Sequence, residues 1–142
     1  MEILNRKATF DYFVNSEIEC GIQLKGTEIK SLRNGSGDLK DTFALIRNGE
    51  VFLHNMYIAK YEEGNIFNHD ERRTRKLLLH KYEIKKLKDK IDREGYSLVP
   101  LKAYLVKNKV KILLGVGKGK KLYDKRETIK ERDLKREAQR IR

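Results

Sequence analysis

The sequence predicts a mainly β domain with inserted helices, whose short antiparallel strands close into a six-stranded barrel, followed by a basic C-terminal tail. Three observations support this fold class. Apolar and polar residues alternate in several short runs, as on half-buried strands. Pairs of turn-forming residues separate these runs. After Gly117 apolar residues become sparse and Lys and Arg accumulate, so the domain is expected to span residues 1–117.

Composition limits the size of the domain and the kind of partner. The 142 residues are enough for one domain and an extension. They carry 33 Lys and Arg against 21 Asp and Glu, and the formal net charge of +12 favours nucleic acid over an anionic membrane surface. A single cysteine, Cys20, excludes an internal disulfide and is expected to be buried. Without an apolar leader or a membrane-length apolar run, the chain is expected to be cytoplasmic and not to bind membranes.

The first elements are two strands and a short helix. Alternation over residues 9–14 predicts a strand, Asn15-Ser16 predicts a turn, and alternation over 18–24 predicts a second strand. At Gly26 the period changes to that of a helix, expected over 26–34, with Asn34-Gly35 at its end. Glu28 is expected in its first turn, and Lys30 and Arg33 are expected to point outward. A loop over 35–38 is expected to follow.

The middle of the chain contains a clear hairpin signal. Asn48-Gly49 lies between strand-like runs at 42–47 and 51–58, and Asn-Gly is typical of two-residue hairpin turns. Residues 60–74 are polar and predict a loop. An apolar stripe made of Leu77, Ile84, Leu87 and Ile91 then predicts a helix from about 73 to 93, with Gly95 ending it.

Two further strands complete the domain. They are expected over residues 96–106 and 109–116, with Lys107-Asn108 as the turn between them. Pro100 cannot donate a ladder hydrogen bond, so it predicts a sheet edge or a bulge. Short strands hide their edges best by closing on themselves, and six strands with an inserted helix resemble an OB-like barrel.

Four blocks of sequence together resemble one known family. The longest reads Gly21-x-x-Leu24-x-Gly26-Thr27-Glu28-Ile29-Lys30-Ser31-Leu32-Arg33. The others are Asn5-Arg6-Lys7-Ala8, Phe67-Asn68-His69-Asp70 with Arg72-Arg73-Thr74-Arg75-Lys76-Leu77-Leu78, and Gly117-Lys118-Gly119-Lys120-Lys121-Leu122-Tyr123-Asp124-Lys125-Arg126. This pattern is similar to the signature of the small protein B (SmpB) family, bacterial proteins that bind transfer-messenger RNA (tmRNA) and help it rescue stalled ribosomes in trans-translation. The family also has an OB-like barrel, and at the position of Tyr123 it often has histidine.

The resemblance implies an RNA-binding face on the barrel, which would grip the tRNA-like domain of tmRNA. Cations would hold phosphates, while Asn68, His69 and Glu28 would contact sugars or bases, or position the loop that does. Arg72, Arg73, Arg75 and Lys76 would collect at a helix N-terminus, where a phosphate backbone could lie. The residues expected on this face are Asn5, Arg6, Lys7, Glu28, Lys30, Arg33, Asn68, His69, Arg72, Arg75 and Lys76.

The tail over residues 118–142 holds half of the net charge of the chain, with eleven Lys and Arg and five Asp and Glu. Its apolar stripe is thin, so we expect it to be disordered when free and helical when bound to a polyanion. A merely solubilising or charge-binding tail is the alternative. The resemblance implies that it enters the empty mRNA channel near the decoding centre of the small ribosomal subunit. The residues expected to act there are Lys118, Lys120, Lys121, Tyr123, Asp124, Lys125 and Arg126.

The resemblance further implies a monomer without cofactor, acting indirectly with alanyl-tRNA synthetase and elongation factor Tu through tmRNA. Two alternatives stay open. One is an RNA nuclease that uses Glu28, Lys30 and His69, although no catalytic motif surrounds them and the three histidines lack metal-ligand spacing. His80 lies on the apolar stripe of the expected helix and is interpreted as a packed residue. The other alternative is a generic OB-type ribosomal or cold-shock protein.

Overall fold

The computed structural model describes residues 1–62 and 68–120. The strands are β1 (Glu2–Leu4), β2 (Tyr12–Ile22), β3 (Gly37–Asp38), β4 (Phe43–Arg47), β5 (Glu50–His54), β6 (Tyr57–Ile58), β7 (Arg75–Leu78), β8 (Ser97–Val106) and β9 (Lys109–Gly119). The helices are α1 (Ala8–Asp11), α2 (Gly26–Arg33) and α3 (Lys81–Glu94). The tail was expected to be disordered when free and helical when bound, and this expectation concerns residues that lie outside the described part of the chain. The predicted tail residues Lys121, Tyr123, Asp124, Lys125 and Arg126 also lie outside it.

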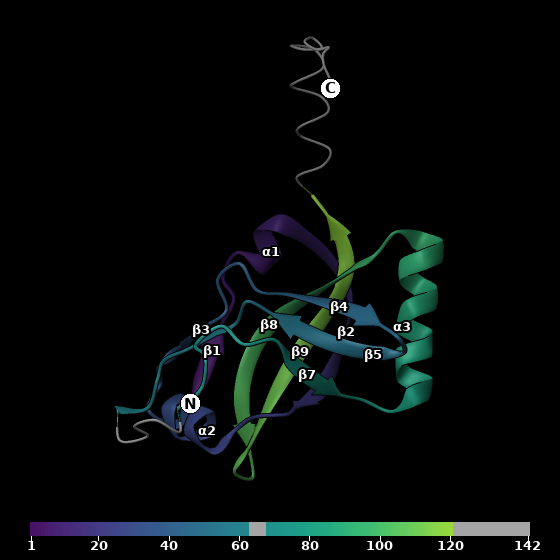
Figure 1. Ribbon diagram of the computed structural model, residues 1–142. Coiled ribbons are helices and arrows are strands. Elements are labelled where there is room, and N and C mark those ends of the chain that lie inside the picture. Colours follow the sequence, from purple (N-terminus) through teal and green to yellow (C-terminus); the bar gives the residue numbers. More distant parts are fainter. Residues whose placement is uncertain (63–67, 121–142) are drawn as a thin grey trace.

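Antiparallel pairing joins six strands into a ring. Neighbours follow the order β8-β4-β5-β7-β2-β9, and β9 pairs again with β8 (Figure 1). The seam between β4 and β8 rests on one residue pair, Ala44 with Leu98, whereas β9 pairs along most of its length with both neighbours. β1 pairs with residues 102–104 of β8, and β3 pairs with β6 in a separate ribbon. The mainly β fold with helices is thus confirmed.

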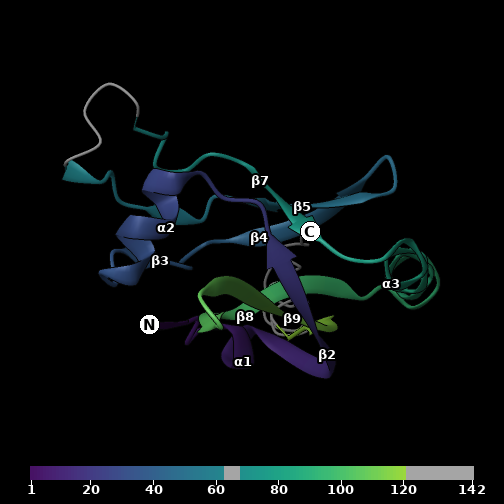
Figure 2. The same cartoon turned by 90° about the horizontal axis from the view of Figure 1, so that it is seen from below.

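The core lies inside this ring and is closed by helices at two sides. Aliphatic side chains with at most 1% exposure point inward from the strands, among them Val51, Leu53, Leu77, Ile112 and Leu114. α3 buries Ile84 and Leu87, and α2 buries Leu32. The two helices lie at opposite sides of the molecule in both views (Figure 1 and Figure 2). One face of the fold is therefore formed by α2 and its neighbouring loops, far from α3.

Two of the expected turns, at 48–49 and 107–108, are confirmed. Asn48 and Gly49 both adopt positive φ, 53° and 75°, between β4 and β5. Lys107 and Asn108 do the same between β8 and β9, at 49° and 68°. Two successive positive φ values are the geometry of a type I′ hairpin turn. A register shift next to Pro100 in β8 confirms the bulge expected there.

The start of the chain differs from the prediction. The two expected strands are one long strand, β2, and Asn15 lies at a bulge between Val14 and Ser16 instead of in a turn. Polar residues that favour turns also suit bulges, where one residue is left unpaired in the ladder. Residues 8–11 form α1, and the apolar lead-in at 2–4 forms β1. Part of the loop expected at 35–38 pairs as β3.

The helix expected from 73 to 93 is wrong in its first third. Residues 75–78 form β7, where Leu77 pairs with Ile22 of β2 and Val51 of β5. α3 begins at Lys81, after His80, whose backbone N–H donates to Glu83 Oε1 at 2.8 Å. His80 is exposed and is not a packed residue. The cations at 72–76 consequently lie in a loop and a strand, not at a helix N-terminus.

β9 continues past the domain end expected at 117. Lys118 and Gly119 pair with Phe13 and Tyr12, so both belong to a strand. Gly117 approaches β2 so closely that a Cβ atom there would lie 1.9 Å from the carbonyl oxygen of Phe13. In the part of the chain described, no helix is long and apolar enough to cross a membrane.

Candidate nucleic-acid interface

A buried carboxylate joins α2 to the segment before β7. Glu28 is fully buried in the first turn of α2. Its Oε2 lies 2.6 Å from Nε of Arg75, and its Oε1 lies 2.6 Å from Nη2 of Arg73. The backbone N–H of Lys25 also donates to Oε1, at 2.8 Å. Both carboxylate oxygens therefore hold protein donors, and Glu28 positions the loop instead of facing solvent.

Arg75 extends this connection to a third segment. Its side chain is fully buried, and Nη1 donates to the carbonyl of Met56 at 2.6 Å. Nη2 donates to the carbonyls of Asp70 and Glu71 at 3.5 and 3.3 Å. A buried ion pair needs such additional hydrogen bonds, because desolvation otherwise outweighs the attraction of its charges. Together, Glu28 and Arg75 fix α2, the strand connection and the loop against each other.

Electrostatics keep this cluster ionised. Burial alone raises the pKa of Glu28, but hydrogen bonds from Arg73, the Lys25 N–H and Arg75 lower that pKa below its ordinary 4.5. Burial lowers the pKa of Arg75, and the adjacent Glu28 carboxylate opposes that shift. An arginine starts from so high a pKa that it stays protonated at neutral pH. The pair is therefore charged under physiological conditions.

Asn68 and His69 fix the other side of the same loop. His69 is 2% exposed, with Nδ1 2.8 Å from the hydroxyl of Thr27 and Nε2 2.9 Å from the carbonyl of Ile58. Since a carbonyl can only accept, Nε2 donates to Ile58, and Nδ1 shares a hydrogen bond with the Thr27 hydroxyl. The Asn68 amide exchanges two hydrogen bonds with the backbone of Tyr61. Both side chains thus support the positioning role over direct base contact.

Exposed cations surround the loop that this cluster holds. Lys30 and Arg33 project outward from α2, as the sequence predicted. Lys30 Nζ lies 5.6 Å from the ring centroid of Tyr61, and Arg72 Cζ lies 5.2 Å from that of Tyr57. These cations, held over half-buried tyrosine rings, offer phosphate-binding groups to RNA.

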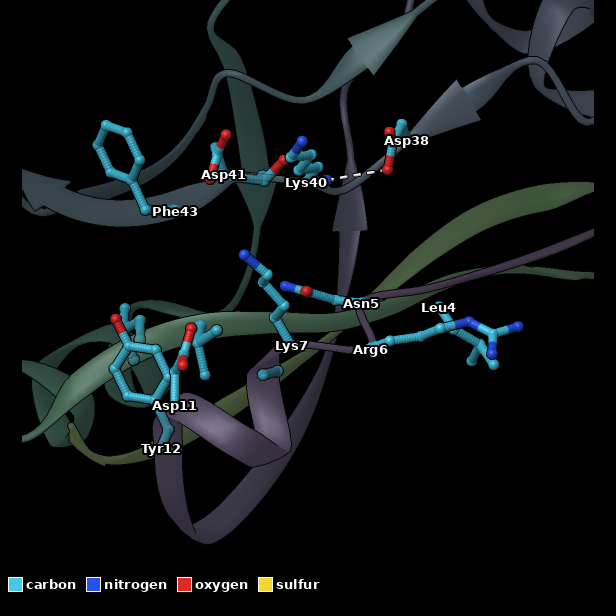
Figure 3. Close-up of a pocket in the computed structure, with 14 residues that line it drawn as sticks. Leu4, Asn5, Arg6, Lys7, Asp11, Tyr12, Asp38, Lys40, Asp41 and Phe43 are labelled. Atoms are coloured by element: carbon cyan, nitrogen blue, oxygen red, sulfur yellow. Dashed lines mark hydrogen bonds between the residues drawn. The ribbon is translucent and has the colours of Figure 1, made fainter. Parts of the chain in front are cut away.

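The block at residues 5–7 lies beside this surface. Asn5 donates from Nδ2 to the carbonyl of Pro100 at 2.8 Å, while Arg6 and Lys7 are exposed. In Figure 3, Lys7 points across a pocket toward the segment at 38–43, and Arg6 points away from it. The N-terminal block therefore meets the connection between α2 and β4.

Three predicted cations lie elsewhere. Lys76 leaves β7 on the outer face, opposite to Arg75, and pairs with Glu50 at 2.7 Å. Lys118 Nζ lies 5.7 Å from the ring centroid of Tyr96, and Lys120 Nζ lies 4.6 Å from that of Phe13. Lys118 lies near the end of β9, and Lys120 directly follows that strand.

Sequence reasoning missed the supporting residues. Arg73 was considered only as a cation that could meet a phosphate backbone, and Thr27 and Tyr61 were not assigned to the site, yet each holds a predicted residue in place. For Arg73 a signal existed, because it stands between two predicted cations. Throughout residues 1–62 and 68–120, no cluster of His, Cys, Asp or Glu could hold a metal ion.

Comparisons with known proteins identify one family. The family model described as "SmpB protein" matches residues 2–142. "SsrA-binding protein" of Staphylococcus epidermidis and that of Bacillus subtilis are each 59% identical over 136 residues, covering 96% of this chain and 87% of theirs. "SsrA-binding protein" of Caldicellulosiruptor bescii is 59% identical over 133 residues, covering 94% of this chain and 84% of its own.

A solved structure shows the same fold. A chain from the study "tmRNA-SmpB: a journey to the center of the bacterial ribosome" aligns with a TM-score of 0.73 and 47% identity, covering 95% of both chains. The sequence blocks, the β fold and these relatives lead to one assignment. The chain belongs to the SmpB family.

Proposed function

We propose that this protein binds tmRNA, also called SsrA RNA, and brings it to stalled ribosomes for trans-translation. Its relatives are named for SsrA binding, and the similar solved chain comes from a study of tmRNA-SmpB in the bacterial ribosome. The observation that carries the proposal is the loop at 68–74, held by buried Glu28, Arg75 and His69 among exposed cations. A rigid basic surface of this kind suits a folded RNA better than a flexible strand.

The residues divide into two roles in this proposal. Lys30, Arg33 and Arg72 neutralise phosphates from the surface, with Arg6 and Lys7 extending the contact. Glu28, Asn68, His69 and Arg75 act from beneath as positioning residues. Because the buried cluster holds the loop that carries Arg72, a matching backbone shape is favoured over an arbitrary one.

The finer features of the proposal follow the family. The six-strand ring would be an OB-like barrel that grips the tRNA-like domain of tmRNA, and the protein would be a cytoplasmic monomer. Its tail would enter the empty mRNA channel near the decoding centre of the small ribosomal subunit. Alanyl-tRNA synthetase and elongation factor Tu would act on the bound tmRNA. In this arrangement the protein is a binding factor, not an enzyme.

The first test is a salt titration. The purified chain is titrated with the tRNA-like fragment of tmRNA and, separately, with a single-stranded RNA of equal length. We expect the tRNA-like fragment to remain bound well above physiological salt and the single strand to dissociate, because shape recognition adds to counterion release. Two curves that fall together would instead support a generic OB-type RNA binder.

Variants that each remove one positive charge, compared with a control on α3, test where the RNA binds. Arg72→Gln and Lys30→Gln each remove one exposed cation of the proposed face. Each should therefore reduce the slope of the logarithm of the binding constant against the logarithm of the salt concentration by the amount due to about one phosphate contact. Lys85→Gln is the control, because Lys85 is equally exposed on α3, at the opposite side of the molecule. If Lys85→Gln weakens binding as much as Arg72→Gln does, the RNA lies elsewhere.

The nuclease alternative loses support from the geometry. Both oxygens of Glu28 hold arginine or backbone donors, and both ring nitrogens of His69 are engaged. A general base or metal ligand needs a free lone pair that reaches the substrate. Incubation of the protein with RNA and Mg²⁺ should therefore leave the RNA intact. Steady cleavage that Glu28→Gln abolishes would contradict the proposal.

A further inference from the structure

The sheet formed by β4, β5 and β7 has an outer side that no described helix covers. α2 and α3 lie at the two ends of this sheet (Figure 2). Side chains alternate along each strand, and Val51, Leu53 and Leu77 point into the core. The residues between them and opposite to those residues therefore point outward. This surface, here named the outer face, comprises Phe43, Leu45, Arg47, Phe52, His54 and Lys76.

Aromatic rings occupy two neighbouring rows of the outer face. Phe43 lies opposite His54 in the register of β4 and β5, and their rings stack with centroids 5.1 Å apart and planes at 11°. This stack covers one side of the Phe43 ring, and the residue is still 45% exposed. In the next row the partly exposed Phe52 lies between Leu45 and Lys76. Two residues along a strand span about 6.6 Å, so the rows offer rings at successive positions.

Cations lie among these rings. Lys76 is next to Phe52 in the register and pairs with Glu50 at 2.7 Å. Arg47, at the hairpin end of the face, is exposed and makes no ion pair with the other described residues. The core of a protein–protein interface is depleted in charged residues. Single-stranded RNA, in contrast, binds where cations follow its phosphates and aromatic rings stack on its bases. The mixture of rings and cations thus favours RNA over a protein partner.

The outer face adjoins the proposed RNA-binding surface. β7 leads directly out of the loop at 68–74. The Thr74 hydroxyl at the end of that loop lies 3.4 Å from Nδ1 of His54. Arg72 donates from Nη1 to the carbonyl of Asn55, the residue that directly follows β5, at 3.1 Å. An RNA whose backbone lies on Arg72 is therefore next to the row of stacked rings.

We infer that the outer face binds an unpaired stretch of the same RNA, with bases on the rings of Phe43 and Phe52 and phosphates on Arg47 and Lys76. The inference rests on the proposed function, because the RNA is the one held at the loop. The folded part of that RNA lies on the cations around the loop, and the outer face adds a site for nucleotides free of base pairing. Since every base has a flat face, this site selects unpaired RNA and not a particular sequence.

A short oligonucleotide tests the site without the folded RNA. Oligo(U) of about eight nucleotides is within the usual size of such sites. It is added to the full ¹⁵N-labelled protein at low salt, where a short strand stays bound, and amide shifts are followed by NMR. We expect shifts at 43–47, 50–54 and 75–78, and nuclear Overhauser effects between base protons and the rings of Phe43 and Phe52. Shifts that leave out these three strands overturn the inference.

Substitutions at Phe43 separate stacking from apolar contact. Phe43→Leu keeps an apolar side chain and removes the ring, so affinity for oligo(U) and for full-length tmRNA should fall about fivefold or more. Phe43→Tyr keeps a ring and should bind as the wild type does. Tyr82→Leu is the matched control, because Tyr82 is 65% exposed on α3 and stacks on His80 much as Phe43 stacks on His54. Equal urea midpoints for Phe43→Leu and Phe43→Tyr establish that the loss is one of binding.

A substitution at Leu45 tests for a protein-type docking surface instead. Leu45 is 47% exposed beside the rings, and Leu45→Ala removes apolar area but no ring. It should change the affinity for RNA by less than about twofold, because stacking carries the binding. A loss as large as that of Phe43→Leu would show that the face is an apolar docking surface and would overturn the inference.

The outcomes separate the two proposals. If the wild type selects the tRNA-like fragment in the salt titration and Phe43→Leu binds tmRNA as the wild type does, the outer face is overturned and the proposed function stands. If the wild type holds both RNAs equally, the proposed function is overturned. The oligo(U) titration of Phe43→Leu then decides on the outer face alone.

Discussion

The Glu28 carboxylate connects α2 to two arginines from a distant part of the chain. Glu28→Gln should destabilise the protein by about 3–5 kcal/mol, because it leaves the buried Arg75 guanidinium without its counter-charge. Glu50→Gln is the matched control, since Glu50 pairs with Lys76 while 46% of its side chain is exposed. That change should cost less than about 1 kcal/mol. Urea unfolding at neutral pH measures both, and equal effects would contradict the role assigned to Glu28.

The pH dependence of stability should also show the effect of the ionised Glu28 carboxylate. The folded-state pKa of Glu28 lies below its ordinary value of 4.5. The contribution of the Glu28 carboxylate to the free energy of unfolding is therefore fully present above the unfolded-state pKa and is lost as the pH falls through the folded-state pKa. The stability difference between wild type and Glu28→Gln should be constant from about pH 5.5 upward and should shrink below about pH 4.5. Urea midpoints across this range give the measurement; a difference that persists unchanged to pH 3 would argue against it.

Cys20 should be unreactive in the folded protein. It is 1% exposed, and burial, aided by nearby Glu83 and Glu19, raises the pKa of its thiol to about 12. Because the thiolate is the reactive form, labelling must wait for opening of the fold. At pH 8, a disulfide reagent such as DTNB should react at least about a hundredfold more slowly with native protein than with urea-unfolded protein. Comparable rates would place Cys20 at the surface.

For single residues, the sequence predicted those positions that depend only on local structure. Lys30 and Arg33 were expected to point outward from their helix, and they do. Glu28 was expected in the first helical turn, which is right, but its burial was not foreseen. Its partner Arg75 is 47 residues away, and no local pattern reveals a pairing over that separation. The outward direction of these cations was therefore predictable, and the buried support of the loop was not.

At the scale of elements, the contact of β9 with β2 depends on Gly117. Gly117→Ala would place Cβ 1.9 Å from the Phe13 carbonyl oxygen, so the strands must separate. We expect a loss of about 1–3 kcal/mol, as for other overpacked sites. Gly26→Ala is the control, because a Cβ there meets nothing within 4 Å and alanine favours the helix. It should be neutral or slightly stabilising in the same urea experiment; similar losses for both would show that β9 tolerates displacement.

Elements whose conformation is set by their own residues could be predicted, and elements that depend on pairing with distant segments could not. Asn48-Gly49 and Lys107-Asn108 adopt their turn conformations through their own backbone preferences. β7 was mistaken for the start of a helix because Leu77 lies seven residues before Ile84 and continues its stripe by coincidence. What makes residues 75–78 a strand is pairing with β2 and β5, which the segment itself does not encode.

For the whole molecule, the boundary between domain and tail decides how the tail can be tested. Deleting residues 121–142 keeps all of β9, so the fold and the affinity for the tRNA-like fragment should be nearly intact. Tagging of incomplete proteins on stalled ribosomes should be abolished in a reconstituted translation assay. Deleting from 118 would also remove two residues paired with β2 and confuse the two effects. If the 121–142 deletion itself loses tRNA-like RNA binding, the division of roles is wrong.

The position of β9 in the sequence also determines when the domain can fold during its synthesis. This strand closes the ring against β2 and β8, yet it is the last strand of the described chain to be synthesised. Its pairing joins Gly119 to Tyr12 across most of the chain, and contacts over such separations form slowly. A nascent chain that stops before codon 109 therefore exposes unpaired edges on both neighbours and cannot complete its core. The domain should therefore acquire its native structure only after β9 has been synthesised.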